Sequence, residues 1–105
     1  MMISVRGEQL LRRAIAHYGR AQQLVKCIEE MNELIHEICR CFERDERGID
    51  PSHIAEELAD VSIMLDQARL ILEIDPYEEY AQRRRKLRRL EARLDAAQGA
   101  EAAER

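Results

Sequence analysis

Apolar residues recur at three- and four-residue steps along most of the chain, which is the spacing of one face of an α-helix. The longest series predicts an amphipathic helix from Arg20 to about Arg44. Its apolar positions are Leu24, Cys27, Ile28, Met31, Leu34, Ile35, Ile38 and Phe42. A shorter series predicts a helix over 8–18. Gly19 then predicts a break or a kink, because glycine commonly ends helices.

Two Asp-Pro pairs mark further helix starts. Aspartate is a favoured N-cap and proline fits the first helical position, so helices are predicted over 51–73 and 76–97. Residues 44–50 lose the periodicity and contain a glycine, which predicts a loop. The tail over 98–105 has no large apolar residue and is expected to fray. The predicted fold is all-α, with about four helices.

The length of 105 residues fits one small domain, predicted over 1–97. Apolar residues make up 46% of the chain, and the low glycine and proline content favours long helices. A domain of this size buries a limited fraction of its surface and often gains stability by association. We therefore expect a helical bundle completed by dimerisation, as a homodimer or a homotetramer.

The net charge of −4 argues against general nucleic-acid binding. The cysteines, Cys27, Cys39 and Cys41, are odd in number and form no disulfide framework, which indicates a reducing compartment. No apolar run has the length of a signal peptide or of a membrane span. These observations predict a cytoplasmic protein that binds neither nucleic acid nor membrane.

Two pairs of acids are the strongest candidates for chemistry. Glu30 and Glu33 are three residues apart, as are Glu57 and Asp60, so each pair shares one side of a helix. On facing helices the pairs would form a cage of oxygen ligands suited to Mg²⁺ or Mn²⁺. Helical spacing places Glu57 among apolar neighbours, where a carboxylate costs several kcal/mol unless it is paired or binds a metal.

A structural explanation of the acids is also open. Either acid of the second pair could form a buried ion pair with Lys26 or with an arginine of the last helix. Lys26 precedes Glu30 by one turn, so it could pair with Glu30 or Glu33 or reach a phosphate. Glu29 points away from the other acids. The histidines are expected to be surface or capping residues: His17, His36 and His53.

Together these positions resemble the MazG-like all-α nucleoside triphosphate pyrophosphohydrolases, whose signature is EExxE followed by ExxD. Here the motifs read Glu29-Glu30-Met31-Asn32-Glu33 and Glu57-Leu58-Ala59-Asp60. Several further stretches look like the short phage and prophage members of this group. These are His17-Tyr18-Gly19, Gln23, the run from Ala59 to Gln67, and the run from Lys86 to Leu90. The similarity covers roughly residues 8–94.

The resemblance implies a Mg²⁺-dependent enzyme, with Mn²⁺ as a substitute, that cuts nucleoside triphosphates between the α and β phosphates. The products would be a monophosphate and pyrophosphate, and the role would be housecleaning of a nucleotide pool. Glu30, Glu33, Glu57 and Asp60 would be the metal ligands, and Glu29 a supporting acid. The resemblance also implies assembly as a dimer or higher. The family signature does not define the preferred base.

Other residues are candidates for contacts with the nucleotide. The basic run over 83–93 contains Lys86 and Arg89, which could face the triphosphate. A solvated helix face explains the same run. Tyr18 could stack on a base or could be a core residue.

Two other functions fit the acids. Glu33 and His36 form a Glu-x-x-His, the local motif of di-iron helical bundles, although the second pair ends in Asp60 and not in histidine. A non-enzymatic dimerisation or adaptor domain would use the acids only as structural ion pairs. That reading predicts full stability without metal and no nucleotide turnover.

Overall fold

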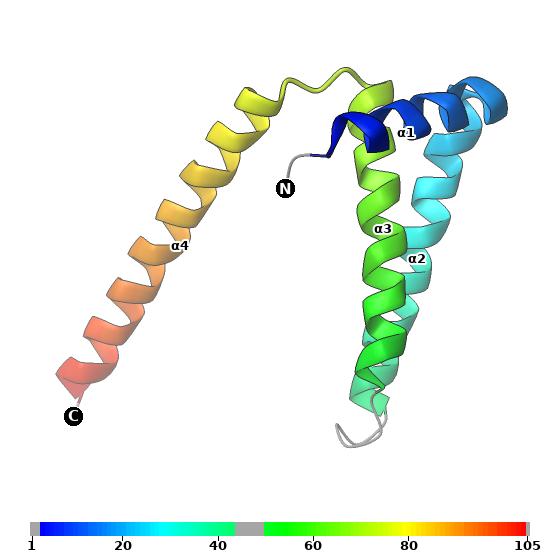
Figure 1. Ribbon diagram of the computed structural model, residues 1–105. Coiled ribbons are helices and arrows are strands. Elements are labelled where there is room, and N and C mark those ends of the chain that lie inside the picture. Colours follow the sequence, from blue (N-terminus) through cyan, green and yellow to red (C-terminus); the bar gives the residue numbers. More distant parts are fainter. Residues whose placement is uncertain (1–2, 44–49, 105) are drawn as a thin grey trace. The chain divides into compact units, whose positions relative to one another are not determined.

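The computed structural model describes residues 3–43 and 50–104 and contains four helices (Figure 1). These helices are α1 (Val5–Tyr18), α2 (Arg20–Glu43), α3 (Pro51–Ile71) and α4 (Pro76–Glu104). Neither described range contains a strand, so the prediction of an all-α fold with four helices is confirmed. None of these helices is long and apolar enough to cross a membrane. The loop predicted over 44–50 lies outside the described residues, except for Asp50.

The chain divides into two units, Met1–Glu73 and Ile74–Arg105, and each is described by itself. The first unit holds α1, α2 and α3, and the second holds α4. The single domain predicted over 1–97 stays a prediction.

The boundary between α1 and α2 lies at the predicted glycine. Gly19 has φ 95°, in the region that favours glycine, and its N–H donates to the carbonyl of Ile15 at 2.8 Å. The break at Gly19 is therefore confirmed. At its other end α1 begins at Val5, earlier than the predicted residue 8. The cause is the Ser4 side chain, which accepts a hydrogen bond from the Gly7 amide at 3.0 Å and caps the helix.

Both Asp-Pro pairs start helices as predicted. The Asp50 side chain accepts a hydrogen bond from the Ser52 amide at 3.0 Å at the start of α3. Asp75 accepts one from the Tyr77 amide at 3.0 Å at the start of α4. Each aspartate thereby satisfies an amide that has no partner within its own helix.

In the first unit α2 and α3 run antiparallel and side by side (Figure 1). α1 lies across the end where α2 begins and α3 ends, and it packs on both helices. Each helix contributes to a small apolar core. Its buried side chains are Leu11, Cys27, Val61, Met64 and Ile71.

A polar contact joins α2 to α3 inside this core. Gln23 Nε2 donates to Gln67 Oε1 at 2.6 Å, and both side chains are buried. Gln67 Nε2 in turn lies 3.6 Å from the sulfur of Met64. One turn before Gln23, Arg20 Nη2 donates to the carbonyl of Ile71 at 2.8 Å, where α3 ends. Because a buried amide loses its water, the glutamine pair favours the one alignment of the helices in which both amides meet.

Replacing Gln67 by leucine should lower the free energy of unfolding by about 1–3 kcal/mol, because the Gln23 amide is left buried without its partner. The double variant Gln23→Leu, Gln67→Leu should recover most of this loss, since no polar group then stays unpaired. Urea unfolding followed by circular dichroism measures both. A double variant no more stable than the single one would show that the glutamines act only through packing.

The side of α2 that packs on α3 carries Gln23, Cys27 and Glu30 as its buried residues. The more apolar side of α2 is solvent-exposed in the described unit. We call it the outer apolar face, and it comprises Ile28, Met31, Ile35, Ile38 and Phe42. Within the first unit only α1 and α3 pack on α2, so this unit leaves the outer apolar face uncovered.

The second unit consists of α4 and the residues at its two ends. α4 continues to Glu104, beyond the predicted end near Ala97, so the tail predicted to fray is helical. Its last turns are rich in alanine and glutamate, which are strong helix formers, and this outweighs the cost of Gly99. None of the described residues of α4 is buried. Its exposed leucines are Leu87, Leu90 and Leu94.

Candidate metal centre

Three carboxylates meet between α2 and α3. Glu30 and Glu33 from α2 and Glu57 from α3 each have one oxygen within 4.8 Å of the others. Glu30 is buried, Glu57 is half-buried and Glu33 is exposed. The group contains both acids of the first predicted pair and Glu57 from the second. Because Glu33 is exposed, the group lies at the edge of the helix pair.

The alignment of the two helices explains why these acids meet. Glu33 lies ten residues after Gln23 on α2, and Glu57 lies ten residues before Gln67 on α3. At 1.5 Å per residue both steps are about 15 Å, so a contact at the glutamines brings the two acids to the same level. The buried amide pair therefore positions the acidic group.

A further contact follows the same spacing beyond the acids. Glu37 lies one turn after Glu33, and His53 lies one turn before Glu57. His53 Nε2 is 3.3 Å from Glu37 Oε2, and Arg40 Nη1 is 3.1 Å from Glu37 Oε1. His53 is exposed, as expected, but its contact with Glu37 was not predicted. The matching one-turn steps were the signal that could have found it.

Two oxygens of the acidic group have no protein partner. Glu30 Oε2 and Glu57 Oε2 are buried, and neither meets a hydrogen-bond donor among the described residues. The other oxygen of Glu30, Oε1, lies 3.2 Å from Lys26 Nζ. Buried carboxylate oxygens without a donor are costly, so these two oxygens leave room for a proton or a cation. Oxygen donors at this spacing fit Mg²⁺ or Mn²⁺.

The pKa of Glu57 reflects this surplus of negative charge. Burial raises it, and the charges of Glu33 and Asp60 raise it further, whereas His53 lowers it. On the other side of the group, the hydrogen bond to Glu30 and the charge of that carboxylate raise the pKa of Lys26. The acids thus favour either a proton or another cation in their midst.

Without metal, the stability of the protein should fall as pH rises from 4.5, the ordinary pKa of Glu57, through its raised folded value. In this window the folded chain still holds a proton that the unfolded chain has released, so raising the pH favours unfolding. Mg²⁺ should reverse the slope, since it binds the ionised carboxylates. Thermal midpoints between pH 4.5 and 7.5, with Mg²⁺ and with chelator, measure the effect. The same slope in both series would contradict it.

The remaining acids of the two motifs lie outside the group. Asp60 is exposed and has no oxygen in the group of three found in the described chain, although its charge acts on Glu57. Glu29 is exposed, and its Oε2 lies 3.8 Å from Lys26 Nζ. Lys26 thus pairs with Glu30, one of the two partners predicted for it. His36, which the di-iron reading requires, is exposed and does not join the group either.

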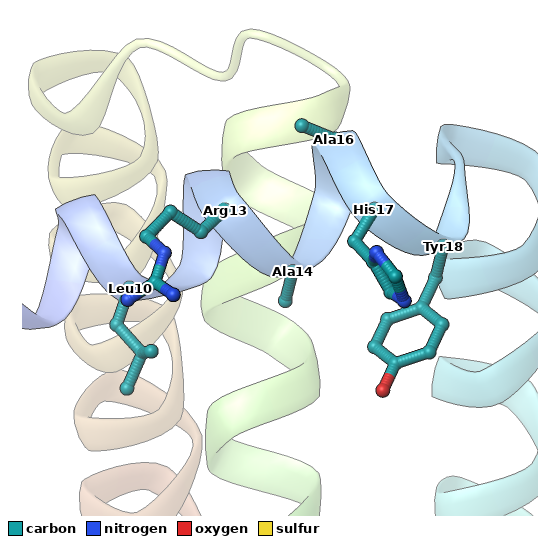
Figure 2. A pocket seen from close by; sticks show the side chains of 6 residues that line it. All are labelled: Leu10, Arg13, Ala14, Ala16, His17 and Tyr18. Carbon is teal, nitrogen blue, oxygen red and sulfur yellow. The ribbon is translucent and has the colours of Figure 1, made fainter.

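Apart from Lys26 on α2, the candidate substrate-binding residues lie on other helices. Lys86 and Arg89 are exposed on α4, in the second unit. Tyr18 is exposed at the end of α1, so it is not a core residue of the described unit. It lines an open hollow along α1 (Figure 2). The residues around this hollow are Leu10, Arg13, Ala14, Ala16, His17 and Tyr18.

Within the hollow, the His17 and Tyr18 rings meet edge to face, with centroids 4.7 Å apart and an interplanar angle of 85°. Figure 2 shows both rings on the same side of α1. Tyr18 is 61% exposed in this setting. Base stacking by Tyr18 stays a prediction.

Comparison with known proteins adds no relative. No family model matches the chain, and no match was found among curated proteins or solved structures. The resemblance to the MazG-like enzymes therefore rests on the two acidic motifs and their flanking residues. The fold adds one observation to this resemblance, because three of the motif acids meet between α2 and α3.

Proposed function

We propose that this protein is a Mg²⁺-dependent pyrophosphohydrolase that converts nucleoside triphosphates, ribo- or deoxy-, to monophosphate and pyrophosphate. The observation that carries the proposal is the pair of buried, unpartnered oxygens of Glu30 and Glu57 within a group of three carboxylates. A purely structural acid pair would be expected to have its oxygens satisfied. Housecleaning of a nucleotide pool is the role that the resemblance suggests.

Each acid has a part in this proposal. Glu30, Glu33 and Glu57 would hold the ion, and Asp60, one turn after Glu57, would supply the fourth oxygen ligand. When bound, Mg²⁺ offsets phosphate charge and activates a water for in-line attack. The side chains orient the ion and the triphosphate, and none of them has to act as a nucleophile.

We further propose that the protein acts as a homodimer or homotetramer joined through the outer apolar face. Large contiguous apolar surfaces on a small domain mark association sites. By helical spacing Ile35 lies about 160° around α2 from Glu33, so the outer apolar face and the acidic group use different sides of the helix. Burying this face would give the small core of each chain the support that domains of this size need.

The outer apolar face also favours a second candidate function, a helical dimerisation or adaptor domain without catalysis. In that case the acids would serve only as structural ion pairs and would bind no metal ion. Metal should then leave the stability unchanged, and no nucleotide should be turned over.

The test of the proposed function is pyrophosphate release from a panel of canonical and modified nucleoside triphosphates with Mg²⁺, Mn²⁺ or chelator. Release that requires a divalent ion, with the monophosphate as the second product, supports the proposal and ranks the substrates. No release from any triphosphate by the folded protein would overturn the enzymatic function and favour the adaptor.

A further inference from the structure

One side-chain cation accompanies the acidic group. In the described part of the chain, Lys26 is the sole lysine or arginine within ion-pair distance of Glu30, Glu33 or Glu57. Its Nζ lies 3.2 Å from Glu30 Oε1 and 3.8 Å from Glu29 Oε2. The ammonium therefore holds Glu30 by Oε1, next to the unpartnered Oε2 of the same carboxylate.

The two partners of this ion pair differ in their freedom. The Glu30 side chain is 11% exposed, whereas the Lys26 side chain is 48% exposed and carries a flexible stem. Lys26 can leave the contact by rotating towards solvent, but Glu30 stays between the helices. The lysine also leaves Glu30 Oε2 and Glu57 Oε2 without a donor, so it neutralises the group only in part.

We propose that Lys26 is an exchangeable counter-ion, which holds Glu30 while the metal is absent and moves to the triphosphate when a metal ion enters. This inference rests on the proposed function, because it takes Glu30 as a metal ligand. A divalent ion at Glu30 repels the ammonium at close range, so Lys26 opposes binding of the ion alone. The oxygens of a triphosphate offer the displaced ammonium a new partner.

The consequence is coupling between the two ligands. Lys26 weakens the affinity for the free ion and strengthens the affinity for the ion together with its triphosphate. Because coupling between two ligands is reciprocal, a triphosphate bound next to Lys26 also raises the affinity for the ion. The ion and the triphosphate would thus bind together. When they are absent, Lys26 would stay paired with Glu30.

The experiment measures two affinities by calorimetry for the full chain and the variant Lys26→Met. The first is for Mn²⁺ alone, and the second is for inorganic triphosphate complexed with Mn²⁺. We expect Lys26→Met to bind Mn²⁺ alone about three- to tenfold more tightly, because a neighbouring positive charge is gone. It should bind the manganese–triphosphate complex about tenfold more weakly.

Two control variants separate this effect from general charge and from folding. Lys26→Arg keeps the cation and should retain the wild-type pattern of the two affinities. Arg12→Met removes a positive charge from another i,i+4 ion pair, that of Arg12 with Glu8 on α1, and should change neither. Circular dichroism confirms that each variant is folded.

The outcomes distinguish the two proposals. Opposite changes of the two affinities in Lys26→Met support the exchange. If the wild type binds Mn²⁺ and Lys26→Met binds it equally or less tightly, the exchange is wrong and the metal centre stands. If neither protein binds Mn²⁺, the metal centre and the inference that rests on it both fail.

Discussion

Glu57→Gln is expected to lower metal-dependent pyrophosphate release by at least about 100-fold and to raise the thermal midpoint of the metal-free protein. The amide keeps the size of the carboxylate but cannot supply an anionic ligand, so the ion loses its one partner on α3 in the group of three. The same change removes a charge whose burial and acidic neighbours disfavour ionisation. Activity and stability should therefore move in opposite directions.

Pyrophosphate release and the thermal midpoint of Glu57→Gln together distinguish a metal ligand from a structural ion pair. If Glu57 were only one half of a structural ion pair, its loss would destabilise the chain. The matched control is Glu56→Gln, which removes the same charge from the adjacent, exposed position on α3. The control should keep its activity and its midpoint within error. A Glu57→Gln protein that retains activity would remove this carboxylate from the metal centre.

The second large effect is expected from Ile35→Asp on the outer apolar face. Ile35 is 56% exposed in the single chain, so an aspartate is readily solvated there and the monomer should still fold. In an assembly through this face the same charge would be buried without a partner. We expect the dissociation constant of the dimer to rise at least about 100-fold, as for a central interface residue.

Light scattering and sedimentation over a range of concentrations measure the assembly. Val5→Asp is the control, because Val5 is an exposed apolar residue on α1, away from α2. Two results would contradict the interface. The first is a wild-type chain that is monomeric at all concentrations. The second is an Ile35→Asp chain that assembles as the wild type does.

Helix positions were predictable because their signals are local. The Asp-Pro pairs and Gly19 act on the backbone of their immediate neighbours, and the structure has caps and a break at these points. Local rules were less reliable at the ends of α1 and α4. Ser4 lies outside the apolar periodicity, and helix propensity carries α4 to Glu104 although its last turns have nothing large to pack.

The group of three acids was predictable in part. Spacing on one helix places Glu30 and Glu33 together, but it does not say which residues of another helix they face. That depends on the alignment of α2 with α3, which the buried contact of Gln23 with Gln67 favours. Neither this pair nor the contact of Glu37 with His53 was predicted, because each joins α2 to α3 and spacing along one helix does not give the alignment of two. Asp60, which the resemblance implies as a fourth ligand, is exposed and contributes no oxygen to the group.

A glutamine and an acid are ten residues apart on both α2 and α3. This equal spacing is a criterion for finding relatives, and the acidic motifs alone do not supply it. Inserting one residue between Gln23 and Glu30 would turn both acids of α2 by about 100° relative to Gln23 and so change which of them lies next to α3, with composition and helix propensity almost unchanged. The spacing between the glutamines and the acids is therefore as characteristic of this chain as the residues themselves. A chain of this kind should place a glutamine ten residues before the last acid of the first motif. It should place a second glutamine ten residues after the first acid of the second motif, whatever the length of the segment between them.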